Sequence, residues 1–218
     1  MTVAEIATKV FEGATATARL RELGLDVQSL LEVVFQGEQA RAEATAHDPI
    51  NAAALDAYRY RVRGIRDRLV PRGWVLDRDG GVEKTWSPDR KHVIITRAGD
   101  SGVGVRGAFP QPKQKPGNEV RTIVEDACLL LDPNWMNVVP KKRKKDDFAT
   151  WMLLVYQQGD EVRSELSSPT SLNDDDVVLG WHERILLPTI DLGDPGSDLS
   201  RESAETPDEI DVPVIRKK

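Results

Sequence analysis

Apolar and polar positions follow helical spacing through the first third of the chain. Between Asp26 and Ala46, the apolar residues that share one helical face are Val27, Leu30, Leu31, Val34 and Phe35. Asp26 precedes them and can cap a helix by accepting hydrogen bonds from its free N–H groups. The pattern predicts an amphipathic helix that begins just after Asp26.

A second helical stripe follows the break at "HDPIN" and has the most regular spacing in the chain. Its apolar residues repeat at steps of three and four: Leu55, Tyr58, Val62, Ile65 and Leu69. Asn51 is placed to cap this helix, and Pro71 and Gly73 are placed to end it. The positions opposite the stripe carry five arginines: Arg59, Arg61, Arg63, Arg66 and Arg68. Residues 1–72 are therefore expected to form a helical region.

From Trp74 onward, short apolar-rich runs alternate with turn residues, which is typical of strands. The expected strands form two units of three, each a hairpin followed by a single strand: residues 74–78, 82–87 and 91–99, then 148–157, 161–169 and 180–190. Between the units, residues 118–132 show helical spacing, and a loop rich in Gly and Pro precedes them.

This order of elements predicts an α+β fold. A helical region over residues 1–72 is followed by a sheet domain over 73–192, mainly antiparallel, with its two three-strand units around one helix. Residues 193–218 are rich in Asp, Glu, Ser, Pro and Gly and contain few apolar residues. Such a segment buries too little surface to offset its ordering entropy, so we expect a disordered acidic tail.

Composition and charge narrow the class of protein. The chain has 218 residues and a formal net charge of −6, and acids outnumber bases by eight to one between Asp191 and Asp211. Cys128 is the only cysteine, so no internal disulfide can form and a reducing compartment is expected. No run approaches the roughly 20 apolar residues of a membrane span, and the N-terminus does not resemble a signal peptide. We expect a cytoplasmic protein that does not enter a membrane.

Two glycine-rich motifs match known signatures only in letters. Gly102–Gly107 fits G-x-G-x-x-G, but the prolines that follow at 110, 112 and 116 exclude the helix on which dinucleotide binding depends. Gly99–Gly102 resembles the nucleophile segment of trypsin-like serine proteases, yet Val103 stands where that family needs glycine. Both interpretations are rejected in favour of a flexible loop.

No catalytic, cofactor or metal set emerges from the remaining polar residues. The three histidines are far apart in sequence, and the H-E-x-x-H pattern that His182 begins is broken by Leu186. Asn173 and the three aspartates that follow it could gather a hard cation but lack the calcium-loop spacing. An enzyme whose site is assembled from distant residues stays open as an alternative.

Basic clusters suggest nucleic-acid binding as an alternative function. Arg59, Arg63 and Arg66 are spaced by four and three residues and share one side of the predicted helix. A second cluster is a run of five basic residues: Lys141, Lys142, Arg143, Lys144 and Lys145. Their convergence would form a footprint for phosphate backbones. The competing interpretation is a helix face neutralised by Asp56 and Asp67, with mobile basic loops.

Four tryptophans lie in or beside predicted strands: Trp74, Trp86, Trp151 and Trp181. We expect them to pack in the core, whereas an exposed pair would indicate a base-stacking or partner surface.

The last strands of the sheet region resemble uncharacterised proteins carried by bacteriophages and integrated mobile elements. The resemblance rests on Thr150-Trp151, Val162-Arg163, Glu165-Leu166-Ser167, Trp181, Glu183-Arg184-Ile185 and Leu187-Pro188. It implies an accessory protein, acting on host machinery, and it implies no activity. Together with the missing catalytic motifs, it favours a non-catalytic protein that binds a macromolecular partner, which is a protein or, alternatively, a nucleic acid.

Overall fold

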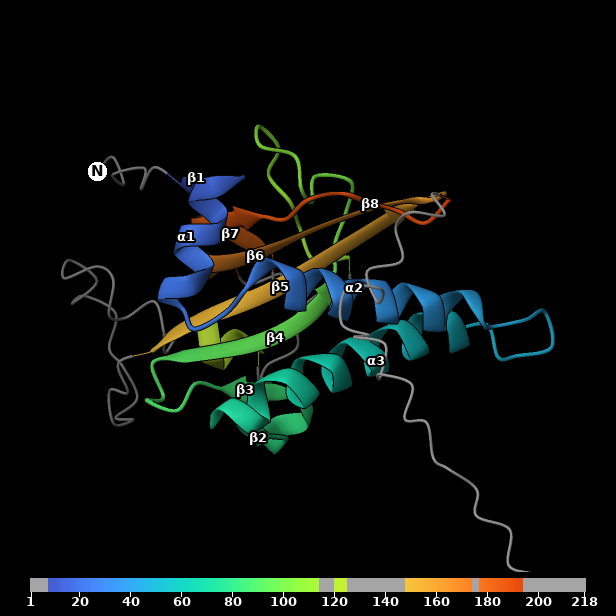
Figure 1. Ribbon diagram of the computed structural model, residues 1–218, viewed down its shortest axis with the longest axis horizontal. Helices are drawn as coiled ribbons and strands as arrows, with labels where there is room; N and C mark the ends of the chain where they lie inside the picture. The colour runs from blue at the N-terminus through green and yellow to red at the C-terminus, as the bar shows by residue number, and fades with distance from the viewer. Residues whose placement is uncertain (1–7, 114–119, 125–147, 174–176, 194–218) are drawn as a thin grey trace, which may run out of the picture.

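A single mixed sheet organises the protein. The computed structural model describes residues 8–113, 120–124, 148–173 and 177–193. The strands are β1 (Lys9–Phe11), β2 (Val75–Asp77), β3 (Lys84–Trp86), β4 (His92–Ala98), β5 (Ala149–Gln158), β6 (Glu161–Leu172), β7 (Val178–Leu186) and β8 (Ile190–Asp191). Their order across the sheet is β1-β7-β6-β5-β4-β3-β2, and β8 pairs with one end of β6 (Figure 1).

The two predicted three-strand units are present and are joined edge to edge. β2, β3 and β4 pair antiparallel, as do β5, β6 and β7. The join is the parallel pair β4–β5, and β1 adds a second parallel pair with β7. The α+β class is therefore confirmed, whereas the sheet is mixed, because a chain that leaves β4 and crosses over returns as a parallel strand.

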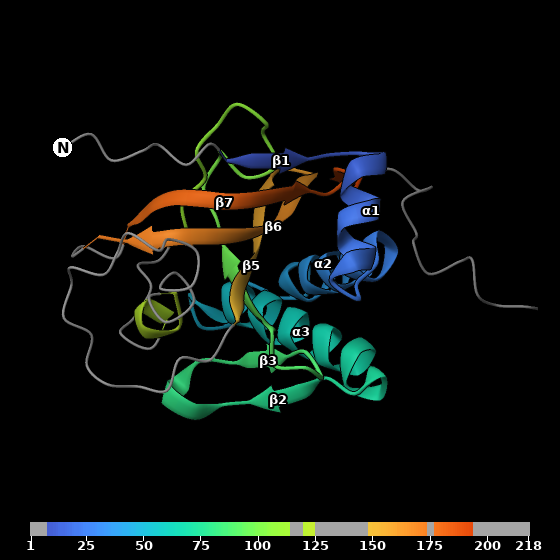
Figure 2. The ribbon, with the colours of Figure 1, turned by 90° about the vertical axis from the view of Figure 1, so that its left-hand side faces the viewer.

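Three helices cover one face of this sheet. They are α1 (Ala14–Glu22), α2 (Val27–Ala42) and α3 (Ala52–Leu69). Figure 2 shows α1 and α2 on one side of the strands and the helical residues 120–124 on the other. The region expected to be helical also contains β1, which the sequence did not predict, because three residues that pair with distant β7 leave no local pattern.

Helix boundaries follow the predicted signals in most places. The carboxylate of Asp26 accepts from the backbone N–H of Ser29 at 2.7 Å and caps α2. Asn51 occupies the N-cap position of α3 but its side chain makes no capping hydrogen bond. Gly73 ends the short 3-10 turn after α3 with a φ of 87°, a left-handed conformation that glycine adopts without strain. Leu55 of the predicted stripe is exposed, since the start of α3 projects beyond the sheet (Figure 1).

Two apolar cores sandwich the sheet. On the helical face, Leu20 of α1 and Val34 of α2 pack with Trp151 and Leu166 of the sheet. On the opposite face, strand residues pack against Val103 and the short helix at 120–124. The predicted regions 1–72 and 73–192 thus share the first core. The predicted acidic tail, 193–218, lies outside the described residues except for Gly193.

Candidate functional site

Residues 99–113 form a compact loop, called here the anchored loop, whose two ends lie side by side (Figure 1). Gly99 and Pro112 form an isolated antiparallel bridge, and the backbone N–H of Lys113 donates to the carbonyl of Ala98 at 2.8 Å. Compact loops of this length with adjoining ends are Ω-loops, which frequently carry function. The rejected G-x-G-x-x-G sequence lies inside this loop, which has no helix in its described length.

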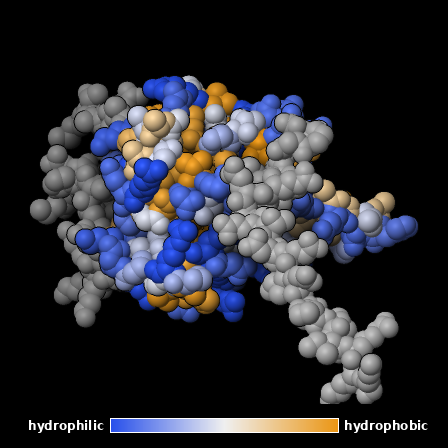
Figure 3. Space-filling model, viewed as in Figure 1, coloured by the Kyte–Doolittle hydropathy of each residue, from blue (hydrophilic) through white to orange (hydrophobic). Residues whose placement is uncertain are grey.

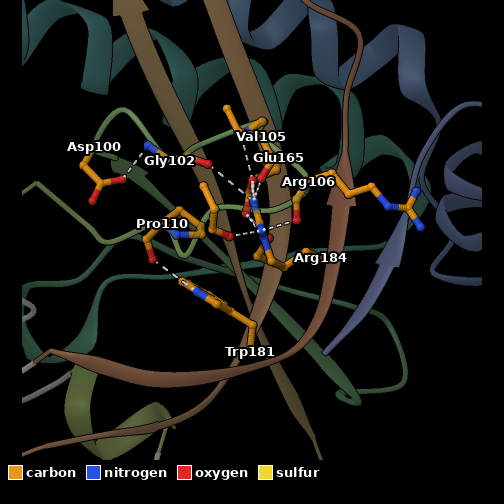
Figure 4. A network of polar contacts seen from close by, with 11 residues as sticks. Asp100, Gly102, Val105, Arg106, Pro110, Glu165, Trp181 and Arg184 are labelled. Carbon is orange, nitrogen blue, oxygen red and sulfur yellow. Dashed lines mark hydrogen bonds and ion pairs between the residues drawn. The ribbon is translucent and has the colours of Figure 1, made fainter. Parts of the chain in front are cut away.

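Arg184 on β7 holds the anchored loop through its backbone carbonyls (Figure 4). Its Nη1 donates to Ala108 at 2.6 Å and to Arg106 at 3.4 Å. Its Nη2 donates to Val105 at 3.1 Å and to Gly102 at 3.5 Å. One guanidinium therefore satisfies carbonyls from both halves of the loop, which has no regular ladder of its own to bind them.

Glu165 on β6 neutralises Arg184 and contacts the same loop. Arg184 Nε lies 2.9 Å from Glu165 Oε1 and Nη2 lies 2.6 Å from Oε2. The carboxylate also accepts from the backbone N–H of Gly104 at 2.8 Å and from the Ser167 hydroxyl at 2.7 Å. Both charged residues are buried, at 0% exposure for Glu165 and 2% for Arg184. Such a pair is stable only when its remaining hydrogen bonds are made, as they are here.

A β-bulge in β7 places a tryptophan beside this pair. Arg184 lies opposite Ser167 in the β6–β7 ladder. Between Glu183 and Trp181, β7 advances two residues while β6 advances one. This irregularity turns Trp181 to the core face that the anchored loop covers, where its indole N–H donates to the carbonyl of Pro110 at 3.2 Å (Figure 4).

Two further contacts hold the loop at its periphery. The Gln111 side chain donates to the Val178 carbonyl at 2.9 Å and accepts from the Val178 N–H at 3.0 Å. The Gln111 amide therefore makes the two hydrogen bonds with the Val178 backbone that a neighbouring strand would otherwise make. Arg106 forms an ion pair with Glu12, which lies between β1 and α1. The loop is thus fixed to both β7 and the N-terminal elements.

The outer end of the anchored loop presents apolar side chains to solvent. Phe109 is 51% exposed and Leu179 is 60% exposed, and Val105 and Val177 are exposed as well. Phe109 lies two residues before Gln111, and Val177 and Leu179 flank Val178, so all three residues lie within two positions of the Gln111–Val178 contact. We call Phe109, Val177 and Leu179 the corner surface.

A second apolar patch lies at the opposite edge of the sheet. Val70, Val75 and Leu76 are exposed in or just before β2. Figure 3 shows apolar atoms at its lower edge, where Figure 1 draws β2. β2 is three residues long, and among the described strands it pairs with β3 alone. Short edge strands limit unwanted strand pairing.

An open cleft of about 560 Å³ lies between β1, α1 and β7. Arg19 lines it and pairs with Glu183 at 2.7 Å and with Glu22 at 2.6 Å. The Arg19 guanidinium also lies 5.9 Å above the ring of Trp151. The cleft is open, and Arg19, Glu22 and Glu183 neutralise one another, so it lacks the enclosure of a typical small-molecule site.

Beneath this cleft, His92 acts as a hydrogen-bond acceptor. Trp151 Nε1 donates to His92 Nδ1 at 3.3 Å, which requires an unprotonated Nδ1. Burial lowers the pKa of His92, and the positive charges of Arg19 and Lys91 act in the same direction. A neutral histidine bonded to a core tryptophan has a structural role here, since no hydroxyl, thiol or carboxylate of the described residues hydrogen-bonds to its imidazole ring.

The predicted arginine cluster is only partly on the surface. Arg59 and Arg63 are exposed, and each pairs with an acid on its own helix, Asp56 at 3.0 Å and Asp67 at 3.5 Å.

Arg66 turns inward, with a side chain that is 12% exposed. It pairs with Glu83 at 2.6 Å and donates to the carbonyls of Asp77 and Lys84. The run from Lys141 to Lys145 lies outside the described residues, so nucleic-acid binding by these clusters stays a prediction.

Arg61 was predicted on the polar side of its helix, and that prediction is wrong. It is buried between α2 and α3, where Nη1 lies 3.3 Å from the buried Glu38 and Nε donates to the Ala57 carbonyl at 3.1 Å. Gly37 makes this arrangement fit, because a Cβ at that position would lie 2.5 Å from Arg61 Cγ. At this position, the side of α3 that is buried is decided by its close approach to Gly37 of α2 and not by the apolar stripe.

The tryptophans pack as expected. Trp74, Trp151 and Trp181 are buried, and Trp86 is half-buried, with Phe148 edge-on at 4.9 Å. None of these four is exposed, so they do not form a base-stacking platform.

The described residues contain no group of three or more metal-ligating side chains, and no helix among them is long and apolar enough to cross a membrane. Cys128 and residues 174–176 lie outside the described part.

The roles of Glu165 and Arg184 did not emerge from the sequence. Both residues belong to the segment that resembles phage proteins, but that resemblance gives them no function. The available signal was a charged residue within each of two apolar-rich strands, where an unpaired charge is costly. Opposite charges in neighbouring strands of one predicted sheet are therefore candidates for a buried pair on sequence grounds alone.

The geometry of the anchored loop is the main guide to function. Comparison of the chain with protein-family models, with curated proteins and with solved structures finds no match.

Proposed function

We propose that this protein is a non-catalytic binding protein that recognises a macromolecular partner through the corner surface. The observation that carries the proposal is a 15-residue loop without helix or extended strand that a buried ion pair fixes to the sheet, with Phe109 exposed at its outer end. Long loops of this kind in compact domains are usually functional.

Pre-organisation is the physical advantage of this arrangement. A loop that is ordered before binding does not lose its conformational entropy when the partner arrives, so more of the contact energy becomes affinity. Aromatic and aliphatic side chains on a fixed frame are typical of interface centres, whereas charged residues are depleted there. Phe109 and Leu179 fit this description, and their apolar character favours a protein partner over a nucleic acid.

The resemblance to proteins of phages and mobile elements supports an accessory role directed at host or phage machinery. An accessory protein needs a surface rather than a reaction centre, and the exposed corner surface supports this proposal. The proposed partner is therefore a protein of the host or of the element itself.

The test is affinity capture from host extract with matched surface variants. The double variant Phe109→Ser/Leu179→Ser removes the centre of the corner surface without touching the ion pair. The control Val75→Ser/Leu76→Ser removes similar apolar area at β2. We expect the wild type and the β2 control to retain one stoichiometric partner, and the corner variant to bind it at least about tenfold more weakly, since interface centres carry most of the binding energy.

Equal capture by the corner variant and the wild type, with loss in the β2 control, would move the interface to β2 and overturn the proposal. Capture that disappears after nuclease treatment would instead support nucleic-acid binding. Circular dichroism of each variant establishes that the fold is retained.

A further inference from the structure

The open cleft between α1 and the β1–β7 pair lies on the helical face of the sheet (Figure 2). Its volume is about 560 Å³, and Phe11 and Ala18 supply its apolar lining. Arg19 also lines the cleft, where it pairs with Glu183 and Glu22. Although the cleft is too open to enclose a small molecule, a groove with apolar and charged walls is the kind of surface that binds a peptide segment.

The two walls of the cleft carry opposite charges. On β1, Lys9 is exposed, lies opposite Glu183 in the β1–β7 ladder, and forms no ion pair with the residues that the structure describes. Phe11 follows it on the same face of that strand. On α1, the side chain of Glu22 is 65% exposed, and Ala18 lies about one turn before it. A matching segment therefore has an acidic end, an apolar middle and a basic end.

The chain beyond the described residues contains a segment with this composition. Residues 194–218 include six apolar residues, and four of them fall close together: Ile210, Val212, Val214 and Ile215. Three acids lie at the start of this apolar run, at positions 208, 209 and 211, and three bases follow it at 216–218. We call residues 208–218 the tail segment. Its order of acids, apolar residues and bases fits the cleft when the acids face Lys9 and the bases face Glu22.

The tail segment is within reach of the cleft. Leu192 packs against the core on the helical face of the sheet, which is the face on which the cleft lies. β8 pairs with β6 at Val162, and Glu183 pairs with β6 at Ser168, so about 20 Å of strand separate the two positions. The chain from 193 to 208 spans up to about 50 Å when it is extended. The connection is therefore long enough without any rearrangement of the fold.

We infer that the tail segment docks in this cleft of its own chain. Its acids pair with Lys9, its apolar side chains pack against Phe11 and Ala18, and its bases approach Glu22. A tether of this length gives an effective concentration of about 1 mM, so a contact with a Kd of about 100 µM is about nine-tenths occupied. The cleft is separate from the corner surface, and the inference does not rest on the proposed function.

Backbone amide NMR tests the inference. Truncation after Glu205 keeps every described residue, and it should shift the amide signals of Thr15, Ala18 and Glu22 because these residues lose the docked segment. Addition of a peptide of residues 206–218 should return the signals to their positions in the full chain. A peptide with the same residues in scrambled order is the control and should bind at least about tenfold more weakly.

Charge reversal in the full chain tests the orientation of the tail segment. Lys9→Glu should release it, so the cleft signals should move to their positions in the truncated chain. Replacing the acids at 208, 209 and 211 by lysine in the same chain should restore docking. Arg21→Glu changes an exposed residue of α1 that does not line the cleft, and it should leave docking unchanged.

Hydrogen exchange of residues 210–215 provides a second readout. Nine-tenths occupancy should slow this exchange about tenfold in the full chain, and Lys9→Glu should abolish the protection. Three results would overturn the inference: cleft signals that are the same with and without the tail segment, equal binding of the scrambled peptide, or docking that increases with protein concentration. The last result would assign the cleft to the tail segment of a second copy.

Discussion

Glu165 and Arg184 are each surrounded by protein, and each would be an uncompensated buried charge without the other. Replacing one partner leaves the other as a buried charge without a counter-charge, whereas replacing both removes the two charges. Any change that removes Arg184 also leaves the loop carbonyls of Ala108 and Val105 without their donor. The Glu165–Arg184 pair therefore links the stability of the whole protein to the order of the anchored loop.

Arg184→Met should lower the free energy of unfolding by about 3–5 kcal/mol, because Glu165 is left as an unpaired buried charge. The double variant Arg184→Met/Glu165→Leu should be destabilised by less than the sum of the two single changes. Urea unfolding of the wild type, both single variants and the double variant closes this cycle. Strict additivity would mean that the two side chains do not stabilise one another.

His92 makes stability depend on pH. Its pKa is lowered in the folded protein, mainly by burial, so the unfolded chain binds the proton more readily. Stability is complete above the ordinary histidine pKa of about 6.5 and declines as the pH falls below it. Protonation also removes the acceptor for the Trp151 indole N–H. His182, whose pKa is likewise lowered by burial, contributes in the same direction.

His92→Asn should reduce this pH dependence, since the amide oxygen of asparagine can accept from Trp151 without titrating. The difference between the unfolding free energies at pH 7.5 and pH 5.5 should be smaller in the variant than in the wild type. The difference that remains in the variant should come from His182. His47 is exposed, and His47→Asn serves as the control with an unchanged difference. An equal difference in His92→Asn and the wild type would contradict the assignment.

At the scale of the elements, α2 and α3 pack closely because each helix has a glycine where it faces the other. Gly37 lies against Arg61, and Gly64 lies against Val33 and the Gln36 amide, so each helix offers a glycine to the other. The buried Glu38–Arg61 pair fits in this narrow space. In an isolated helix, alanine is preferred over glycine by about 1 kcal/mol, but a clash between helices opposes that preference.

Gly37→Ala should therefore destabilise the protein by about 1–3 kcal/mol despite its higher helix propensity. The new Cβ would lie 2.5 Å from Arg61 Cγ and 3.0 Å from the Ala57 carbonyl oxygen, so the two helices must separate. Gln39→Ala, an exposed change in the same helix, controls for propensity and should have little effect. Stabilisation by Gly37→Ala would show that α2 and α3 can separate without loss.

At the scale of the whole molecule, most arginines of α3 form ion pairs with nearby acidic side chains. Arg59 and Arg63 pair with acids of the same helix, Arg66 pairs with Glu83, and the chain carries a net charge of −6. Phosphate-backbone binding depends on uncompensated positive charge and weakens steeply with salt.

We therefore expect no retention on heparin at about 50 mM salt. Retention that falls steeply with salt and is lost in Arg59→Ser/Arg63→Ser would establish the nucleic-acid alternative on α3. Retention that is lost only when Lys141–Lys145 are replaced by serine would assign it to that run. Elution position against salt concentration is the measurement.

The sequence by itself determined the kinds of element and much of their order. The stripe of α2, its Asp26 cap, both hairpins and the burial of Trp74, Trp151 and Trp181 follow from periodicity and turn chemistry. These signals are local, since the residues that produce them lie within one helix or one hairpin. They were sufficient for the α+β class.

Only the tertiary structure decided which distant segments meet. The parallel pairs β4–β5 and β1–β7, the inward side of α3 at Arg61, and the meeting of Arg184 with Glu165 all depend on long-range register. A shift of one residue in a strand moves a side chain to the other face, and the β7 bulge makes such a shift at Trp181. Because no local pattern specifies that shift, the candidate site could not be assembled from the sequence.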